Sequence, residues 1–249
     1  MKKLYTICFC LLLSGTLSAQ EFFIGAQVIP QQSWLLNQDD ADLPESQYKQ
    51  KSLGGVAAGI KGGYRLGKIR LETGLLYSQE GGRYSLENAS GVRYDQTTRL
   101  EYLKVPLIVG FLPTELERKW NAFVGAGVQL DYLVRAYTYN DNTDYQPPVP
   151  DNYLNYPSTR EAFAPVGLRG VGQIGVDVKL TYELSMNMYL RVDYLFSDVE
   201  DKEESFVIVE DGESREQLFW PYVRGEERTA ATHPISMGLV IGLNYSFGQ

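Results

Sequence analysis

Hydrophobic and polar residues alternate one by one along most of the chain, which is the period of a strand with two different faces. In the segment WNAFVGAGVQLDYLVRA, which begins at Trp120, one face is apolar from Ala122 to Val134. The other face carries small or polar residues from Asn121 to Arg135. The same division recurs in residues 186–196 and 235–247.

Eight segments alternate in this way, each of roughly 8 to 15 residues, which is enough for a tilted strand to cross a membrane. They begin near Phe22, Leu53, Ile69, Leu100, Trp120, Val166, Met186 and Ile235. Long polar connections (Pro30 to Ser52, Gln79 to Thr98, Tyr137 to Pro165 and Ser197 to Pro234) alternate with short ones at 66–68, 112–119 and 181–185. This order is typical of outer-membrane barrels, whose periplasmic turns are short and whose external loops are long. The pattern predicts an all-β, eight-stranded antiparallel up-and-down transmembrane β-barrel with long extracellular loops.

The beginning of the chain has the pattern of an export signal. Two lysines precede an apolar run from Leu4 to Leu13, and small residues follow up to Ala19. We expect a signal peptide over residues 1–20 and one barrel domain over 21–249. Both cysteines, Cys8 and Cys10, lie in the signal, so the mature chain is expected to have neither a disulfide nor a thiolate metal site.

The net charge of the chain is negative, which limits the classes of partner that it could bind. The formal charge of −8 becomes −10 when Lys2 and Lys3 are removed with the signal. An acidic chain does not favour binding to nucleic acid. We therefore expect an acidic exposed surface and no nucleic acid partner. The partners expected of an outer-membrane barrel are the lipid and lipopolysaccharide around it, and a protein could bind through the extracellular loops.

If the apolar faces point to lipid, a set of charged residues must point into the lumen. They are Lys61, Arg65, Arg70, Glu72, Lys104, Asp131, Arg135, Arg169, Asp177, Lys179, Arg191 and Asp193. Buried charges need partners, and we expect networks such as Arg70 with the neighbours of Glu72, and Arg191 with Asp177. A lumen filled in this way predicts that the protein is not a general diffusion pore; a narrow channel remains an alternative.

A soluble barrel would also alternate, but two features favour the membrane. Aromatic residues gather at strand ends: Tyr77, Tyr102, Tyr132 and Tyr194 towards the long loops, and Tyr64, Phe111, Trp120 and Tyr245 towards the short turns. The polar face is rich in glycine, which leaves room for long charged side chains in a narrow barrel: Gly59, Gly74, Gly110, Gly125, Gly127, Gly175, Gly238 and Gly242.

Residues Gly170 to Gly175 read GVGQIG, and Asp193 follows at the spacing of a dinucleotide-binding fold. Such a site needs a helix directly after the glycines, whereas VDVKL continues the alternation after Gly175. We therefore place Gly170 and Gly172 on the lipid side of a strand and Gly175 inside. No cofactor or metal site is expected.

His233 is the only histidine and the one candidate for a catalytic base in a lipid-modifying enzyme. A loop-edge role is the favoured interpretation, because a nucleophile elbow of the form G-x-S-x-G is missing from the sequence. We therefore predict a non-enzymatic protein and no catalytic residues; an enzyme at the barrel mouth is the alternative.

The long connections are acidic and carry aromatic residues. Residues 197–234 hold acidic runs from Asp198 to Glu204 and from Glu210 to Glu213, where divalent cations could bridge carboxylates to lipopolysaccharide phosphates; a solvated acidic surface is favoured. Residues 205–214 predict a hairpin around Asp211 and Gly212 that lengthens the barrel wall and could accept a partner strand. Aromatic residues of these connections could anchor a protein partner: Trp34, Tyr137, Tyr139, Tyr145, Tyr153, Tyr156, Phe219, Trp220 and Tyr222.

Several segments resemble the PorT-like outer-membrane β-barrel family of the Bacteroidetes: the signal ending SAQ, LEYLKVPLIVGF from Leu100, WNAFVGAGVQLDYL from Trp120 and the closing GLVIGLNYSFGQ. The resemblance covers residues 22–249, and the best marker is Tyr102 followed by Val105 and Pro106. It implies an eight-stranded barrel inserted by the barrel-assembly machinery through a C-terminal aromatic residue; Phe247 is third from the end here. A role connected to type IX secretion is what the founding member of the family implies.

Overall fold

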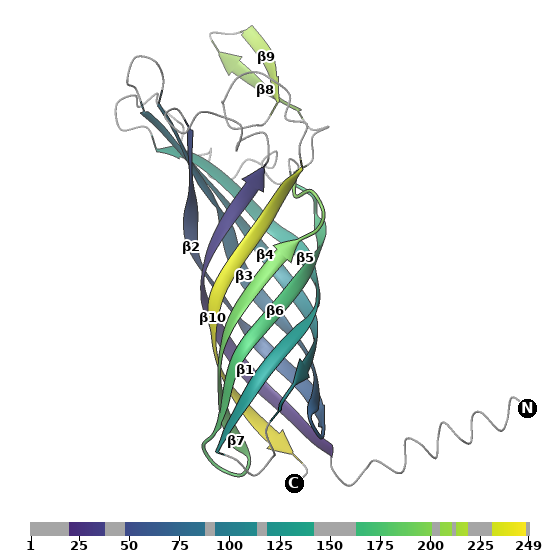
Figure 1. Cartoon of the computed structure of the whole chain (residues 1–249). Helices are drawn as coiled ribbons and strands as arrows, with labels where there is room; N and C mark the ends of the chain where they lie inside the picture. The colour runs from purple at the N-terminus through teal and green to yellow at the C-terminus, as the bar shows by residue number, and fades with distance from the viewer. Residues whose placement is uncertain are drawn as a thin grey trace, which may run out of the picture.

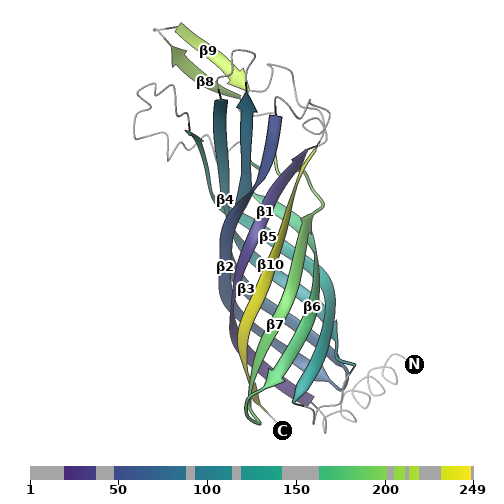
Figure 2. The ribbon, with the colours of Figure 1, turned by 60° about the vertical axis from the view of Figure 1, so that its left-hand side comes forward.

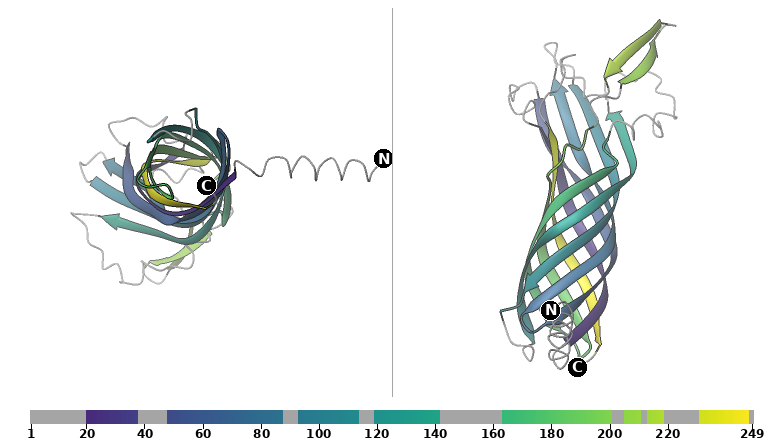
Figure 3. Two further views of the ribbon diagram at one scale, coloured as in Figure 1. Left: turned by 90° about the horizontal axis from the view of Figure 1, so that it is seen from below. Right: turned by 90° about the vertical axis from the view of Figure 1, so that its right-hand side faces the viewer.

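The computed structural model describes residues 20–37, 48–87, 93–113, 119–141, 163–200, 205–210, 213–218 and 231–247. Eight strands close into one antiparallel barrel: β1 (Gln20–Asn37), β2 (Tyr48–Leu66), β3 (Ile69–Glu87), β4 (Arg93–Phe111), β5 (Trp120–Asp141), β6 (Val166–Lys179), β7 (Leu184–Leu195) and β10 (Thr232–Phe247). Figure 1 shows them as steeply tilted ribbons, and the view along the axis in Figure 3 shows a closed ring.

Each barrel strand pairs with its neighbours in sequence, and β1 closes the ring by pairing with β10 from Phe22↔Phe247 to Asn37↔Thr232. The predicted fold class is therefore confirmed. Short connections join β2 to β3 and β6 to β7 at one end, here called the turn end, where β1 begins and β10 finishes. The opposite end is called the loop end.

Alternation places apolar side chains on the outside of the barrel and polar ones inside. Large hydrophobic residues such as Ile60, Leu107 and Ile174 are more than half exposed on the outer face. Such an outer surface suits lipid and not water. No helix in the described ranges is long and apolar enough to cross a membrane.

Six of the eight barrel strands are longer than the sequence predicts, with 16 residues in β10 and 22 in β5, whereas β6 with 14 and β7 with 12 fall within the predicted range. The expected loop 30–52 contains the end of β1 and the start of β2, and the expected loop 79–98 contains the end of β3 and the start of β4. Polar residues past the membrane boundary obscure the alternation, which is why their strand character was missed.

The upper parts of β2, β3, β4 and β5 form a sheet that projects beyond the barrel rim (Figure 2). β2 pairs with β1 only up to Ser33↔Leu53, and β5 pairs with β6 only up to Tyr132↔Val166. Above these two points the four strands pair only with one another among the described ladders. We call this part the projecting sheet.

The predicted hairpin exists as β8 (Ser205–Glu210) paired with β9 (Glu213–Leu218). It forms a two-stranded sheet of its own and is not part of the barrel sheet. The expectation that it lengthens the barrel wall is therefore wrong, because the projecting sheet comes from β2 to β5. Residues 1–19, which include almost all of the expected signal peptide, lie outside the described residues.

Candidate functional site: the charged lumen

The lumen is lined by ion pairs arranged in two clusters. The turn-end cluster consists of Lys61, Arg70, Glu72 and Asp177, and the loop-end cluster consists of Glu80, Lys104, Asp131, Arg169, Arg191 and Asp193. All ten side chains are buried. Each cluster holds as many carboxylates as cations, so both are neutral.

Arg70 is the centre of the turn-end cluster. Its guanidinium lies 2.7 Å from a carboxylate oxygen of Asp177 and 3.5 Å from Glu72. It also donates a hydrogen bond of 2.7 Å to the hydroxyl of Tyr189 and lies 4.0 Å from the centre of the Phe123 ring. The aromatic ring faces and the carboxylates together stabilise a cation that burial alone would destabilise.

Two inward glycines make this arrangement possible. A Cβ atom on Gly110 would collide with the Phe123 ring, and one on Gly175 would lie 2.7 Å from the ring of Tyr189. The predicted inward glycines therefore hold the space into which Phe123 and Tyr189 pack. A Cβ on Gly172 would meet nothing within 4 Å, in agreement with its predicted outward position.

Glu80 is the centre of the loop-end cluster. It forms ion pairs with Lys104 and with Arg169, the second at 2.7 Å, and accepts a hydrogen bond from Ser236 at 3.2 Å. Arg169 also pairs with Asp131 and is fully buried. The guanidinium of Arg169 lies 5.3 Å from the centre of the Tyr102 ring.

Glu80 was missed by the sequence analysis because it fell within an expected loop. The alternation of Glu72, Leu76 and Ser78 continues to Glu80, and all four side chains are buried. This continuation is the signal that could have identified it.

The expected ion pairs are partly wrong. Arg191 pairs with Asp193 at 2.8 Å and not with Asp177, which pairs instead with Arg70. Arg191 lies on β7, and Asp177 lies nearer the turn end, where Arg70 of β3 reaches it across the lumen.

Arg135 and Tyr102 face opposite to their predicted directions. The pairs Glu101↔Arg135 and Tyr102↔Leu133 leave Val134 as an extra residue in β5. This β-bulge reverses the alternation, so Arg135 is exposed on the outer face, where it donates to the Tyr137 hydroxyl at 3.3 Å. Tyr102, predicted at the aromatic girdle, is instead buried in the lumen with 3 % of its surface exposed.

The remaining predicted lumen and girdle residues fall as expected. Arg65 is buried near the turn end, where its Nε donates to the carbonyl of Gly67 at 3.0 Å, and Lys179 is half-buried there. Both line a cavity of about 30 Å³ at the turn-end mouth, which is room for about two water molecules. Outward aromatic residues occur near both ends: Tyr77, Tyr132 and Tyr194 near the loop end, and Phe111, Trp120 and Tyr245 near the turn end.

The loop-end mouth is covered by two short segments that fold over it, residues 163–165 and 196–200. We call them the lid. Phe163 and Val199 are 3 % and 1 % exposed and pack in one apolar cluster with Leu35, Tyr84 and Leu133. Backbone hydrogen bonds join Ala164 to Val199 and Val199 to Thr232, at 2.9 and 3.0 Å.

Asp198 holds the lid to the barrel. One of its carboxylate oxygens accepts from the backbone amides of Glu200, at 3.1 Å, and Thr232, at 2.9 Å. Asp198 and Glu200, two members of the predicted acidic runs, are thus tied to the lid. Most of the remaining acidic-loop residues, and most of the loop aromatics from Tyr145 to Tyr222, lie outside the described residues.

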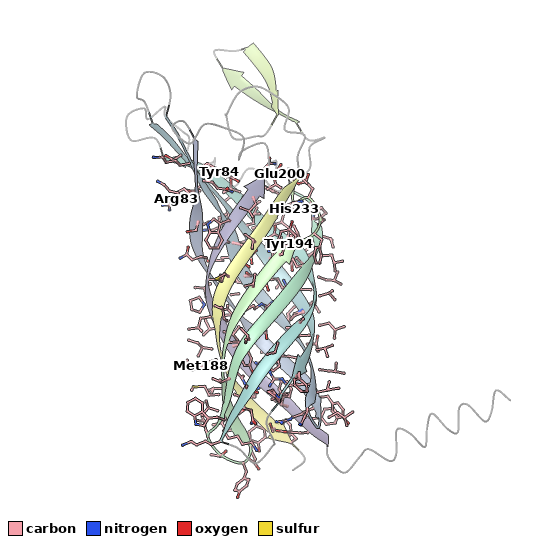
Figure 4. The ribbon with its side chains drawn as sticks, in the orientation of Figure 1. Arg83, Tyr84, Met188, Tyr194, Glu200 and His233 are labelled. Carbon is pink, nitrogen blue, oxygen red and sulfur yellow. The ribbon has the colours of Figure 1, made fainter. Side chains whose placement is uncertain are left out.

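His233 lies on β10 with Leu36 as its cross-strand partner, and Leu36 is 40 % exposed on the outer face. Its ring stacks on Tyr194 with 5.6 Å between centroids, and its Nδ1 lies 3.2 Å from the carbonyl oxygen of Leu195 (Figure 4). In the part of the chain that the structure describes, no hydrogen bond joins His233 to a serine or a carboxylate. Within the same ranges, no group of three or more His, Cys, Asp or Glu residues could hold a metal ion.

Three solved structures illustrate what this chain is similar to. Neisserial surface protein A matches at 13 % identity over 91 % of this chain and 97 % of its own, with a TM-score of 0.45. OprG from Pseudomonas aeruginosa matches at 14 % identity over 93 % and 98 %, with a TM-score of 0.43. Outer membrane protein W of Escherichia coli matches at 14 % identity over 92 % and 99 %, with a TM-score of 0.38.

A comparison with curated proteins gave no match. The model of one protein family, described as the outer membrane protein beta-barrel domain, matches residues 23–201. That range contains the turn-end cluster, the loop-end cluster and both lid segments. The PorT-like family within this broader group stays a prediction. The chain belongs to the outer membrane protein beta-barrel domain family and is a β-barrel of the outer membrane of a Gram-negative bacterium.

Proposed function

We propose that this protein is a closed, non-conducting and non-enzymatic barrel that acts through its extracellular surface in interaction or envelope organisation. In this proposal the loop end faces the outside of the cell and the turn end faces the periplasm. The single observation that carries it is the filled lumen, in which the inward side chains of Arg169, Tyr189 and Phe123 are each fully buried.

The lumen is closed at the lid and again at the contact between Phe123 and Arg70, which supports the proposal that the barrel does not conduct ions. An ion entering from the loop end would have to displace the lid and its apolar cluster before it reached the buried Arg169. Further along the axis it would meet Phe123 and Arg70 packed face to face. Moving an ion past such tightly packed and electrically neutral layers is costly.

The test is conductance of the purified, refolded protein in a planar bilayer. We expect a flat current record, because the closed lumen provides no continuous water path. An Arg169→Ala, Lys104→Ala double variant serves as a comparison, since it removes two long side chains from the centre of the lumen. Discrete, reproducible conductance steps from the unmodified protein would contradict the proposal and favour the narrow channel.

The enzyme alternative is tested through His233. Hydrolysis of phospholipid by the purified protein that disappears in His233→Ala would overturn the non-enzymatic proposal. A matched control is Tyr194→Phe, which retains the ring stacked on His233 and removes only a hydroxyl group. We expect no hydrolysis that depends on His233, because this histidine faces outward and contacts a backbone carbonyl.

The projecting sheet offers a place for a protein partner. Beyond Tyr132, β5 pairs with β4 alone among the described strands, up to Asp95↔Asp141. An unpaired strand edge can accept an extended segment of another protein through backbone hydrogen bonds. A partner in secretion, as the PorT-like resemblance implies, would dock here.

Site-specific photo-crosslinking in intact cells tests this docking place. A crosslinker at Tyr137, beside the open edge, is expected to capture a discrete protein adduct. The same crosslinker at Trp120, on the outer face of β5 at the turn end, is the control. Identical adducts from both positions, or none from Tyr137, would count against an interaction at the edge of β5.

A further inference from the structure

The outer face of the projecting sheet carries a group of basic side chains: Lys49 and Lys51 on β2, Arg83 on β3, Arg99 on β4 and Arg135 on β5. We call this group the basic band. Lys49, Lys51, Arg83 and Arg135 are exposed, and Arg99 is half-exposed. Figure 4 shows Arg83 on the outer side of the projecting strands, farther toward the loop end than Tyr194.

The register brings these cations side by side. Lys51 lies directly opposite Arg83 on the neighbouring strand. Arg99 is opposite Gly81, two residues from Arg83 on β3. Like charges directly across a strand pair repel each other, so the sheet has an unfavourable contact that an anion would relieve.

One described carboxylate, Glu101, lies among the five cations of the basic band, directly opposite Arg135. None of the five cations forms an ion pair with another described residue, in contrast to the lumen cations. Glu101 is 7 % exposed and lies within 3.5 Å of Gln79. The whole chain has a formal charge of −8, so this basic surface runs against the overall charge.

The height of the basic band above the membrane can be measured from a row of outward residues that lies below it. Tyr77, Leu103 and Tyr132 lie side by side on β3, β4 and β5 and are 40 %, 38 % and 49 % exposed. Outward aromatic residues of this kind sit at the boundary between hydrocarbon and headgroups. This row therefore marks the membrane boundary beneath the basic band.

The distance from that boundary can be estimated from strand geometry. Arg135 pairs with Glu101, which is two residues beyond Leu103 of the row, because Val134 is a bulge residue. With a rise of about 3.3 Å per residue and a tilt of about 45°, Arg135 lies roughly 5 Å above the row. The headgroup layer on each side of a bilayer is about 5–8 Å thick. Arg83, six residues beyond Tyr77 in a strand with continuous register to β4, lies roughly three times as high. The basic band thus extends from the headgroup layer into the layer of sugars above it.

We propose that the basic band binds the phosphate groups of lipopolysaccharide in the outer leaflet. This inference rests on the orientation in the proposed function, with the loop end outside the cell. Lipopolysaccharide carries phosphates at both heights that the basic band covers, and guanidinium groups bind phosphate oxygens in pairs. The basic band lies on the same outer face as the outward row below it, so the ligand approaches laterally, as a lipid neighbour does.

The test uses the full-length protein in detergent, with purified lipopolysaccharide that contains lipid A and the phosphorylated inner core as the probe. The variant is Arg83→Gln, Arg99→Gln, Arg135→Gln. Its control is Lys68→Gln, Lys119→Gln, which removes exposed cations at the turn end. We expect each lost arginine to weaken binding by about three- to tenfold, and the control to bind as the unmodified protein does.

Two further probes separate the sources of phosphate. Chemically dephosphorylated lipopolysaccharide is expected to bind the unmodified protein as weakly as intact lipopolysaccharide binds the triple variant. Inorganic phosphate at millimolar concentration is expected not to displace intact lipopolysaccharide. Equal binding of the dephosphorylated probe, efficient displacement by inorganic phosphate, or unchanged affinity of the triple variant would each overturn the proposal.

Heat-dependent gel mobility of every variant confirms that the barrel is folded before binding is compared. Failure of this inference is distinguishable from failure of the closed-barrel proposal, because conductance tests the lumen and does not involve the outer face of the projecting sheet.

Discussion

Arg169 and Glu80 meet across the lumen at 2.7 Å although they lie on β6 and β3, which β5 and β4 separate in the barrel. The same two strands form a second cross-lumen pair, Arg70 with Asp177, also at 2.7 Å. The polarity is reversed between the two pairs, because β3 supplies the cation near the turn end and the carboxylate near the loop end. These contacts tie opposite walls of the barrel together independently of the hydrogen-bond ladders.

Removing one member of the Glu80–Arg169 pair is expected to destabilise the barrel strongly. Glu80→Gln leaves Arg169 and Lys104 without their shared carboxylate, and losing one partner of a buried pair costs about 3–5 kcal/mol. The measurement is the unfolding midpoint in denaturant, read from the mobility of folded and unfolded forms on gels. Lys68→Gln, an exposed turn residue, is the control.

The double variant Glu80→Gln, Arg169→Gln makes that test specific. If the two groups interact directly, the double variant loses less stability than the sum of the single variants. Strict additivity of the two losses would show that they act independently and would contradict the cross-lumen pair.

Gly172 and Gly175 lie on opposite faces of β6, so replacing each with valine should affect folding very differently. Gly172→Val is expected to fold with little change, because the added side chain enters open space on the lipid face. Gly175→Val is expected to prevent folding or to lower stability by more than about 3 kcal/mol, since the new side chain would occupy the place of the Tyr189 ring. Heat-dependent gel mobility after refolding compares them, and equal behaviour would refute the assigned faces.

The lid should open when Asp198 is replaced. Asp198→Ala leaves the amides of Glu200 and Thr232 without their acceptor, which costs about 1–3 kcal/mol locally. We expect faster hydrogen exchange at residues 196–200 and unchanged exchange in β6 and β7. Asp198→Asn, which keeps an acceptor oxygen, should exchange at nearly the original rate. Protection of the lid in Asp198→Ala equal to that of the unmodified protein would mean that other contacts hold it.

The orientation in the membrane can be read from two engineered cysteines, because the two natural ones lie within the expected signal peptide. Lys49→Cys is placed on the projecting sheet at the loop end, and Lys68→Cys in the turn between β2 and β3. A membrane-impermeant maleimide is expected to label the first and not the second in intact cells. The reverse labelling would invert the orientation and remove the basis for binding lipopolysaccharide at the basic band.

Alternation was enough to predict the eight strands, the closed barrel and most lumen residues, because each predicted inward position from Lys61 to Asp193 follows from counting by two within a strand. The count fails where a residue is inserted. Val134 is such an insertion, and the types of the residues around it do not distinguish a β-bulge from a regular strand. For this reason the sequence predicted that Arg135 points into the lumen, whereas in the structure it points outward.

The lid was missed for a different reason. Phe163 and Val199 lie in polar connections, and their burial depends on contacts with Leu35, Tyr84 and Leu133 from three other strands. Pairings such as Arg70 with Asp177 likewise depend on the three-dimensional distance across the barrel, which the order of residues along one strand does not encode. The face of each charge could be predicted, whereas its partner could not.

The cross-lumen pairs also bear on how the barrel is assembled. Arg70 and Asp177 are 107 residues apart in the chain, so the ion pair between them can form only after the wall between them has curled around. A slip of one residue in any intervening register would turn one of these charges toward lipid, where it is costly. Both cross-lumen pairs can therefore form only in a barrel whose intervening strands are in the correct register.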